Sequence, residues 1–263
     1  MGKKQMFNKL LSAFGFNIVS INELYKLKED KANTRHFIDG LLSFFLTVKG
    51  PPLKVCQIGA YDGVSGDPIY NFLMENKENI DALLIEPQKK PFYDCMNNYS
   101  DNPNVRFLNV AISPEPSKKL TLYISSNAKQ GGGSGTTPER ERRVLLNAKK
   151  LGVSEEESSA CLNSFTIDCM ILKEAMFKSD FGGNLDFLQV DCEGYDDQVL
   201  YASDLESLLP AAINYEFRHL SPERYNRLSK WLDSLGYIRF RWNKRDECAI
   251  SSSNKKYSFN INT

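Results

Sequence analysis

A repeated alternation of short apolar segments with amphipathic segments constrains the fold of this chain more than any other feature of its sequence. The apolar segments are runs of consecutive hydrophobic residues, which is typical of strands that are covered on both faces. Strands separated by helices need crossover connections and therefore form a parallel sheet. We predict an α/β fold with helices on both faces of the sheet. The predicted strands are residues 53–58, 82–85, 105–110, 185–190 and 211–217, with an additional strand at 120–124.

Helices are predicted between these strands. Asp67 and Ser221 each precede a proline, which makes them suitable N-caps for helices that have proline at the first helical position. Gly236 is a helix stop signal, and the two apolar segments that follow it predict a terminal antiparallel hairpin at residues 237–242 and 247–251. The predicted helices are residues 68–75, 89–97, 166–178, a segment from about 196, and 221–235.

Two parts of the chain lie outside this alternation. Apolar residues recur at helical spacing from about residue 5 to residue 47, and Pro51-Pro52 ends that pattern. We therefore expect residues 1–50 to form an N-terminal helical extension and residues 51–263 to form the main domain. A glycine-rich stretch lies in an expected inserted loop at residues 125–160, where either a flexible linker or a lid over a substrate fits the composition.

The composition excludes several classes of protein. The 263 residues include 33 Lys plus Arg and 33 Asp plus Glu, whereas a general nucleic-acid binder needs a basic excess. No apolar run is long enough to cross a bilayer, so we expect no transmembrane segment. The six cysteines form no C-x-x-C pair, and two histidines are too few for a His-rich metal site. Reduced thiols in a cytoplasmic protein are the simplest interpretation.

The first candidate site follows the first predicted strand. Gly59 ends that strand, and a glycine there lets a ligand approach the backbone closely. The next predicted strand ends in Glu86, whose carboxylate can bind both hydroxyls of a ribose at the carboxyl edge of the sheet. The G-x-G-x-x-G fingerprint is absent, which favours a nucleoside cofactor such as S-adenosylmethionine over a dinucleotide. The alternative is that Gly59 and Gly63 only form a tight turn.

The second candidate site consists of acids at the ends of two later strands. Asp191 directly follows the strand at 185–190, and Glu216 lies near the end of the strand at 211–217. If these strands are neighbours, their ends lie about 4.8 Å apart, and His219 can reach the same crevice. Such a group can hold a general base near neutral pH or a hard divalent ion. Alternatively, Asp191 and Glu193 only cap the helix that follows.

Four motifs resemble the FkbM family of S-adenosylmethionine-dependent methyltransferases, which have a class I, Rossmann-like domain. The resemblance covers about residues 53 to 250, and its most specific part is D-x-E-G followed by an apolar Val-Leu. The motif Gly-Ala-x-x-Gly is shared with many methyltransferases. The four motifs are V-C-Q-I-G-A-Y-D-G at 55–63, L-I-E-P at 84–87, N-V-A-I-S at 109–113 and Q-V-D-C-E-G-Y at 189–195.

The resemblance implies both a fold and a set of cofactor contacts. The implied fold is a seven-stranded, mostly parallel sheet with an antiparallel last strand, in agreement with the predicted hairpin. The glycine motif would line the methionine part of the cofactor, Glu86 the ribose, and residues 109–111 the adenine side. The expected cofactor-binding residues are Gln57, Gly59, Ala60, Asp62, Gly63, Glu86, Pro87, Asn109, Ala111 and Asp191.

This chain departs from the class I pattern at one position of the first motif. Many class I enzymes have an acid where this chain has Gln57. Gln57 can still form hydrogen bonds, but it carries no charge. We therefore expect Asp62 to supply the negative charge near the amino group of the cofactor.

The expected reaction is transfer of a methyl group from S-adenosylmethionine to a hydroxyl of a sugar, a glycan or another small acceptor. The acceptor must lie in line with the methyl group, and its proton must leave as it attacks. We expect Asp191, Glu216 or His219 to take that proton. A divalent metal held by Asp191 and Glu216 is a lesser option, and no dedicated metal site is predicted.

Two other functions are compatible with the same motifs. One is a non-catalytic relative with a degenerate cofactor site that binds a partner through the glycine-rich insertion. The other is a nicotinamide oxidoreductase, which the missing second glycine of the fingerprint disfavours. The N-terminal helices could form a homodimer or dock on a membrane-associated glycan machinery, and the sequence does not decide between these partners.

Overall fold

The computed structural model describes residues 31–116, 119–125, 134–135 and 162–252. Residues 1–30 of the expected N-terminal extension and most of the expected inserted loop lie outside the described residues. In the described part of the chain, no helix is both long and apolar enough to span a membrane.

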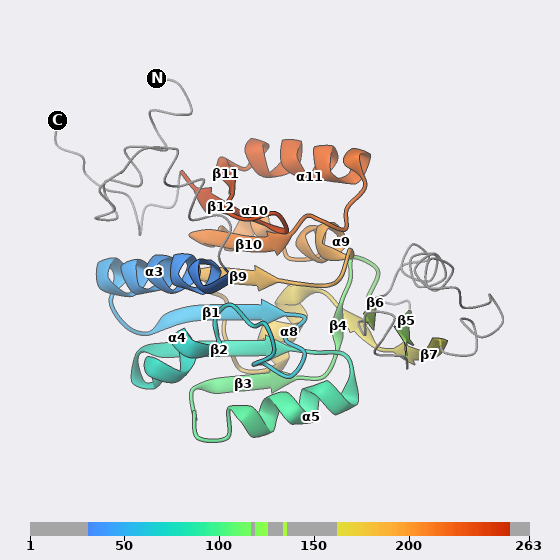
Figure 1. The fold of residues 1–263 in the computed structure, drawn as a ribbon, viewed down its shortest axis with the longest axis horizontal. Coiled ribbons are helices and arrows are strands. Elements are labelled where there is room, and N and C mark those ends of the chain that lie inside the picture. Colours follow the sequence, from blue (N-terminus) through green and yellow to red (C-terminus); the bar gives the residue numbers. More distant parts are fainter. Residues whose placement is uncertain (1–30, 117–118, 126–133, 136–161, 253–263) are drawn as a thin grey trace.

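The main sheet has seven strands in the order β11-β12-β10-β9-β1-β2-β3 (Figure 1). All neighbouring strands are parallel except those that pair with β12, which runs antiparallel to both β10 and β11. The predicted seven-stranded sheet and its antiparallel last strand are therefore confirmed. Its strands are β1 (Leu53–Ile58), β2 (Ile80–Ile85), β3 (Val105–Leu108), β9 (Phe187–Val190), β10 (Ala212–Glu216), β11 (Tyr237–Arg241) and β12 (Asp246–Ser251).

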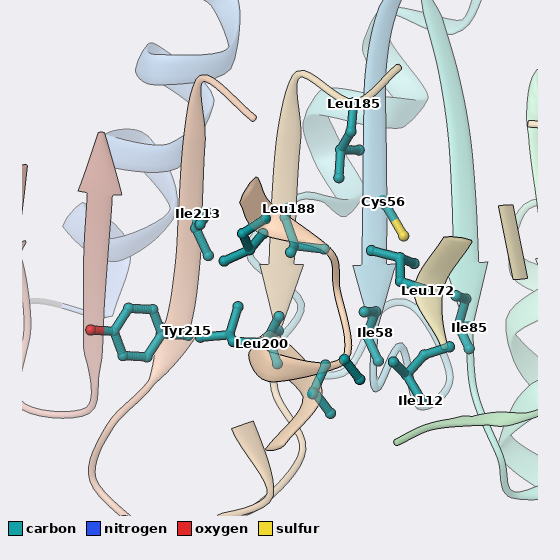
Figure 2. Close-up of a cluster of buried hydrophobic side chains, with 14 of the residues drawn as sticks. Cys56, Ile58, Ile85, Ile112, Leu172, Leu185, Leu188, Leu200, Ile213 and Tyr215 are labelled. Carbon is teal, nitrogen blue, oxygen red and sulfur yellow. The ribbon is translucent and has the colours of Figure 1, made fainter. Parts of the chain in front are cut away.

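Helices cover both faces of this sheet, as predicted. Side chains alternate between the two faces along each strand, and those on each face are buried against helices. Val55 of β1 belongs to a core shared with three helices, α3 (Lys31–Lys49), α4 (Tyr70–Glu75) and α5 (Lys89–Asn98). Its neighbour Cys56 belongs to the core on the other face, part of which Figure 2 shows. The helices packed there are α8 (Leu172–Lys178), α9 (Asp196–Tyr201), α10 (Leu205–Leu208) and α11 (Pro222–Ser234).

Two small sheets lie beyond the arrowheads of β1 and β2 in Figure 1. One pairs β4 (Ala111–Ile112) with β8 (Cys169–Met170) in parallel, and the other has the order β6-β5-β7. The strands of the second sheet are β5 (Leu120–Ser125), β6 (Ser134–Gly135) and β7 (Leu162–Ile167). The predicted strand at 120–124 is confirmed, and it stands outside the main sheet.

The prediction of one helix over residues 166–178 is wrong in its first half. Strand β7 occupies residues 162–167, where it pairs antiparallel with β5, and the helix starts only at Leu172. Phe165, Thr166 and Ile167 favour a strand once a partner strand is available, so pairing overrides the helical spacing. A smaller correction concerns α4, which begins at Tyr70 and not at Pro68.

The predicted N-caps behave differently at the two positions. The Oγ of Ser221 accepts a hydrogen bond from the backbone N–H of Arg224 at the start of α11, as expected of an N-cap. Asp67 lies two residues before the cap position of α4, and its Oδ1 accepts hydrogen bonds from the backbone N–H groups of Ile69 and Tyr70. The Asp67 side chain still anchors the first turn of the helix.

Candidate active site

A cavity of about 310 Å³ opens at the carboxyl edge of the sheet. It is lined by the residues that follow β1, β2 and β9, by strands β4 and β5, and by the turn between β11 and β12. Strand β1 lies between β2 and β9, so the chain order reverses at this point. Ligands of open α/β sheets bind at such a switch point, and the volume is typical of small-molecule sites.

A glycine is required at position 59, just after β1, because the backbone there comes very close to the backbone at the end of β9. Its φ is +81°, and a Cβ atom would lie 2.0 Å from the carbonyl oxygen of Asp191. The backbone N–H of Asp191 also donates to the carbonyl of Ile58 at 3.0 Å. Glycine therefore allows the ends of β1 and β9 to meet and places Asp191 on the wall of the cavity.

Gly63 closes a tight turn after β1. Its N–H donates to the carbonyl of Ala60 at 2.8 Å. A Cβ atom there would lie 2.7 Å from Tyr99 Cε2 and 2.8 Å from Cys95 Sγ. Gly63 is thus packed against α5 and does not line the cavity. The tight-turn interpretation describes Gly63, whereas Gly59 belongs to the cavity.

Glu86 lies at the carboxyl end of β2 and lines the cavity, although only 4% of the residue is exposed. Its Oε2 accepts from the backbone N–H of Tyr61 and its Oε1 from that of Gln88, both at 2.8 Å. Burial raises the pKa of Glu86, and these two donors oppose the shift. A carboxylate oxygen has more than one acceptor site, so both oxygens can still bind hydroxyl groups.

Asn109 supports this carboxylate from the next strand. Its Nδ2 donates to the backbone carbonyls of Glu86 at 2.7 Å and Pro87 at 3.0 Å. These bonds hold the end of β2 against the end of β3. Asn109 therefore supports the loop that carries Pro87, which lines the cavity, without lining the cavity itself.

Gln57 and Asp62, the two polar residues of the first motif that were expected to contact the cofactor, lie outside the cavity lining. Gln57 is buried and donates from Nε2 to the Asp67 carboxylate at 2.6 Å. Asp62 accepts from the N–H groups of Val64 and Ser65 and from the Ser65 hydroxyl, and it closes the turn after β1. The expected contact of Gln57 and Asp62 with a cofactor stays a prediction.

Asp191 lines the cavity at the end of β9. Burial raises its pKa well above the usual range, and the nearby carboxylates of Asp196, Glu216 and Glu193 add to the shift. The residues that the structure describes offer this carboxylate no hydrogen bond. Asp191 is therefore an acid that faces the cavity without a structural partner in the described chain.

Asp196, the first residue of α9, braces the loop that precedes this helix, whereas the cap residue Tyr195 makes no side-chain cap hydrogen bond. Asp196 is fully buried, and its Oδ2 accepts from the N–H of Gly194 at 3.1 Å. Its Oδ1 accepts from the N–H groups of Cys192 at 3.4 Å and Glu216 at 3.3 Å. Burial is the main reason that the pKa of Asp196 is raised to about 7. Asp196 thereby ties the D-x-E-G loop to the end of β10.

Glu216 and His219 lie near Glu193, which lines the cavity, because β9 and β10 are parallel neighbours. Glu216 is fully buried, and its Oε1 accepts from Arg245 Nε at 2.9 Å and Nη2 at 2.8 Å. His219 Nε2 lies 3.4 Å from Glu216 Oε2 and 3.5 Å from Glu193 Oε2. Of this group, Glu193 and Arg245 line the cavity.

The cavity thus includes part of the expected site and several residues that sequence reasoning missed. The lining residues that were expected are Gly59, Glu86, Pro87, Ala111 and Asp191. Those that were expected but lie outside the lining are Gln57, Ala60, Asp62, Gly63, Asn109, Glu216 and His219. Those that were missed include Tyr61, Ser65, Gly66, Gln88, Tyr195 and Arg245.

The missed residues differ in how well the sequence could have revealed them. Tyr61 and Tyr195 stand inside the two glycine-containing motifs, so their place in the sequence is a usable signal. Arg245 lies in the turn of the terminal hairpin, and its approach to the cavity depends on the pairing of β10 with β12. Nothing in its local sequence indicates that approach.

Comparison with known proteins agrees with this arrangement. A family model described as the methyltransferase FkbM domain matches residues 57–239, which is more than half of the chain. No curated protein matches the sequence.

Solved methyltransferase structures are similar to the chain at low identity. Precorrin-6y C5,15-methyltransferase from Geobacter metallireducens GS-15 is 9% identical, with a TM-score of 0.39, over 81% of this chain and 88% of that chain. The human methyltransferase 10 domain containing protein is 12% identical, with a TM-score of 0.44, over 83% and 81%. TrmK from M. capricolum, in complex with S-adenosyl-homocysteine, is 10% identical, with a TM-score of 0.37, over 80% and 66%.

The family match extends from the first glycine motif to the first strand of the terminal hairpin. It includes all the residues that line the cavity except Arg245. It agrees with the seven-stranded, Rossmann-like sheet and its antiparallel last strand. The chain therefore belongs to the FkbM methyltransferase family.

Proposed function

We propose that the protein is an S-adenosylmethionine-dependent methyltransferase that acts on a hydroxyl of a sugar, a glycan or another small acceptor. The observation that carries this proposal is the cavity at the switch point, which has the buried Glu86 carboxylate on one wall and the Asp191 carboxylate on another. The family match supports the methyl transfer, and the cavity supports the cofactor.

The lining of the cavity fits a nucleoside cofactor that carries positive charge. The Glu86 carboxylate has acceptor capacity for the two ribose hydroxyls. Val110, Ile112 and Leu122 provide an apolar surface on which the adenine would pack. Asp191 and Glu193 give the opposite wall a negative potential, which suits a cationic ligand.

Each of these residues has a distinct contribution to the reaction. S-adenosylmethionine supplies an electrophilic methyl group when it is bound. Glu86 would hold the cofactor in one orientation, so that an acceptor can be aligned with it. Asp191 would accept the proton of the acceptor hydroxyl, because its carboxylate faces the cavity and has no hydrogen-bond partner among the described residues. Glu216 and His219, the other expected bases, lie behind Glu193 and Arg245.

Methyl transfer to a panel of hydroxylated sugars and small alcohols tests this assignment. The full chain is incubated with methyl-labelled S-adenosylmethionine, and incorporation is compared for the wild-type protein, Asp191→Asn and the exposed control Glu75→Gln. We expect Asp191→Asn to lose about two to four orders of magnitude in turnover while it still binds the cofactor. Full turnover by Asp191→Asn would contradict its role as the base.

Failure to bind S-adenosylmethionine would favour the alternative of a non-catalytic binding protein with a degenerate cofactor site. In that case the acids at the cavity would serve recognition and not proton transfer. The nicotinamide alternative also predicts that S-adenosylmethionine does not bind. It further predicts that a nicotinamide cofactor binds in the cavity instead.

The cysteines support a reducing compartment, and we propose the cytoplasm. The described cysteines are all unpaired, and three of them are buried in the core. Unpaired thiols of this kind are typical of proteins that fold where disulfides do not persist. Reversible labelling of thiols in intact cells, followed by mass spectrometry, checks this proposal.

A further inference from the structure

Three side chains at the ends of β9 and β10 form a cluster with the chemistry of a metal site. Glu193, Glu216 and His219 each present one ligand atom, and these atoms all lie within 4.8 Å of one another. Glu193 follows β9, Glu216 is the last residue of β10, and His219 is three residues further on. The parallel pairing of the two strands therefore builds the cluster from segments far apart in the sequence.

A second observation points to a ligand in this cluster. The Oε2 atom of Glu216 is buried and has no hydrogen-bond partner, whereas its Oε1 is held by Arg245. An unsatisfied buried acceptor is rare in folded proteins and is costly to maintain. This orphan oxygen faces His219 Nε2 at 3.4 Å, and Glu193 Oε2 approaches the same nitrogen at 3.5 Å. A bound cation between these atoms would satisfy the oxygen.

The charges around the cluster also favour a cation. The carboxylates of Glu193, Asp196 and Asp246 all interact unfavourably with that of Glu216. Arg245 offsets part of this charge, and its side chain is half exposed at the edge of the cavity. The cluster therefore has an excess of negative charge in a buried position, where a divalent cation is more strongly attracted than in water.

We propose that Glu193, Glu216 and His219 bind one divalent cation of the Mn²⁺ class beside the cofactor cavity. Mn²⁺ accepts carboxylate oxygens and also an imidazole nitrogen, whereas Ca²⁺ and Mg²⁺ prefer oxygen ligands alone. Three protein ligands leave further coordination positions for water or for oxygen atoms of an acceptor. Because Glu193 also lines the cavity, an ion bound to it lies at the cavity edge.

Titration of the full chain with Mn²⁺ tests the site without any need for the acceptor. The protein is first freed of metal with a chelator, and the free Mn²⁺ signal in electron paramagnetic resonance is then followed as protein is added. We expect one ion per chain, and at least a tenfold weaker affinity in Glu193→Gln and His219→Gln. The matched control Glu75→Gln carries the same chemical change on the exposed end of α4 and should bind as the wild type does.

The choice of variants keeps the test decisive. Glu216→Gln would leave Arg245 without its buried partner and would risk unfolding the chain. The more exposed ligands Glu193 and His219 are therefore replaced instead, and circular dichroism checks that both variants are folded. A rise in unfolding temperature with Mn²⁺ in the wild type but not in Glu193→Gln is a second expected result. Failure of the wild type to bind Mn²⁺ at millimolar concentration, or equal binding by all variants, would overturn the proposal.

The metal site and the cofactor site can fail independently. Glu86→Gln should lose affinity for S-adenosylmethionine and keep its Mn²⁺ affinity, because Glu86 is not a member of the cluster. His219→Gln should show the reverse. Loss of cofactor binding alone would therefore count against the proposed function and not against the cation site.

Discussion

Asp67 should make the stability of the protein fall as the pH rises, and Asp67→Asn should remove that dependence. Asp67 is buried at the start of α4, and burial raises its pKa to about 6 from the ordinary value of 3.8. Hydrogen bonds from Gln57, Ile69 and Tyr70 oppose the shift without cancelling it. The charged form is therefore less favourable in the folded protein than in the unfolded chain.

The magnitude follows from the difference between these two pKa values, about 6 minus 3.8. At about 1.36 kcal/mol for each pKa unit, Asp67 contributes about 3 kcal/mol of stability when it is protonated. Because the folded pKa is the higher one, this contribution is complete below pH 3.8 and is lost as the pH rises through about 6. About half of the change, roughly 1.4 kcal/mol, falls between pH 5 and pH 8.

The amide in Asp67→Asn cannot ionise, and the local geometry accommodates it. Its oxygen can keep the bonds from the N–H groups of Ile69 and Tyr70. Its nitrogen would face Gln57, whose Oε1 is now buried without a partner and can accept once the Gln57 amide turns over. The variant should therefore fold as the wild type does.

Urea unfolding at pH 5 and pH 8 measures this effect, with exposed Asp168→Asn as the control. The difference in unfolding free energy between Asp67→Asn and the wild type should rise by about 1.4 kcal/mol from pH 5 to pH 8. The control should show no such rise. An equal pH dependence of all three proteins would refute the reasoning, because it would mean that the hydrogen bonds from Gln57 and the backbone fully compensate the burial of the charge.

Three further substitutions test the contacts that shape the site. Gly59→Ala should lower the free energy of unfolding by about 3 kcal/mol, because of the left-handed backbone and a Cβ clash with the carbonyl of Asp191. Unchanged stability in chemical unfolding would contradict this. Gly63→Ala should cost a similar amount, since its Cβ would meet a ring and a thiol of α5, and it should leave cofactor affinity within about threefold once folded. Arg245→Met should cost about 2 kcal/mol of folding stability, because it removes the partner of buried Glu216. This cost is smaller than for a fully buried pair, since Arg245 is half exposed. Unchanged thermal unfolding would count against that ion pair.

The main sheet could be predicted from the sequence because its strands carry an unambiguous pattern. The run at 82–85 is apolar throughout and the run at 53–58 is mostly apolar, and the residue after each run, Gly59 or Glu86, marks its end. The segment at 166–178 could not be predicted in the same way. Its first residues pair with β5, which is distant in the sequence, and that pairing decides their conformation.

The candidate site was predictable where strand order alone places a side chain. Glu86 and Asp191 directly follow parallel strands, so the carboxyl edge of the sheet determines their positions. The hydrogen bond of Gln57 to buried Asp67 could not be predicted, because the two residues are separated by the turn after β1, and the expected contact of Gln57 with a cofactor stays a prediction. Arg245 could not be placed, because its position depends on the register of β12 against β10.

Calorimetric titration with S-adenosylmethionine and S-adenosylhomocysteine tests the central claim most directly. The wild-type chain and the control Glu75→Gln should each bind one cofactor molecule, and Glu86→Gln should bind it at least tenfold more weakly. That pattern would place the ribose at the end of β2 and make the search for the acceptor the next step. Absence of binding in the wild type, or equal binding by Glu86→Gln, would contradict the account of the cavity as a cofactor site.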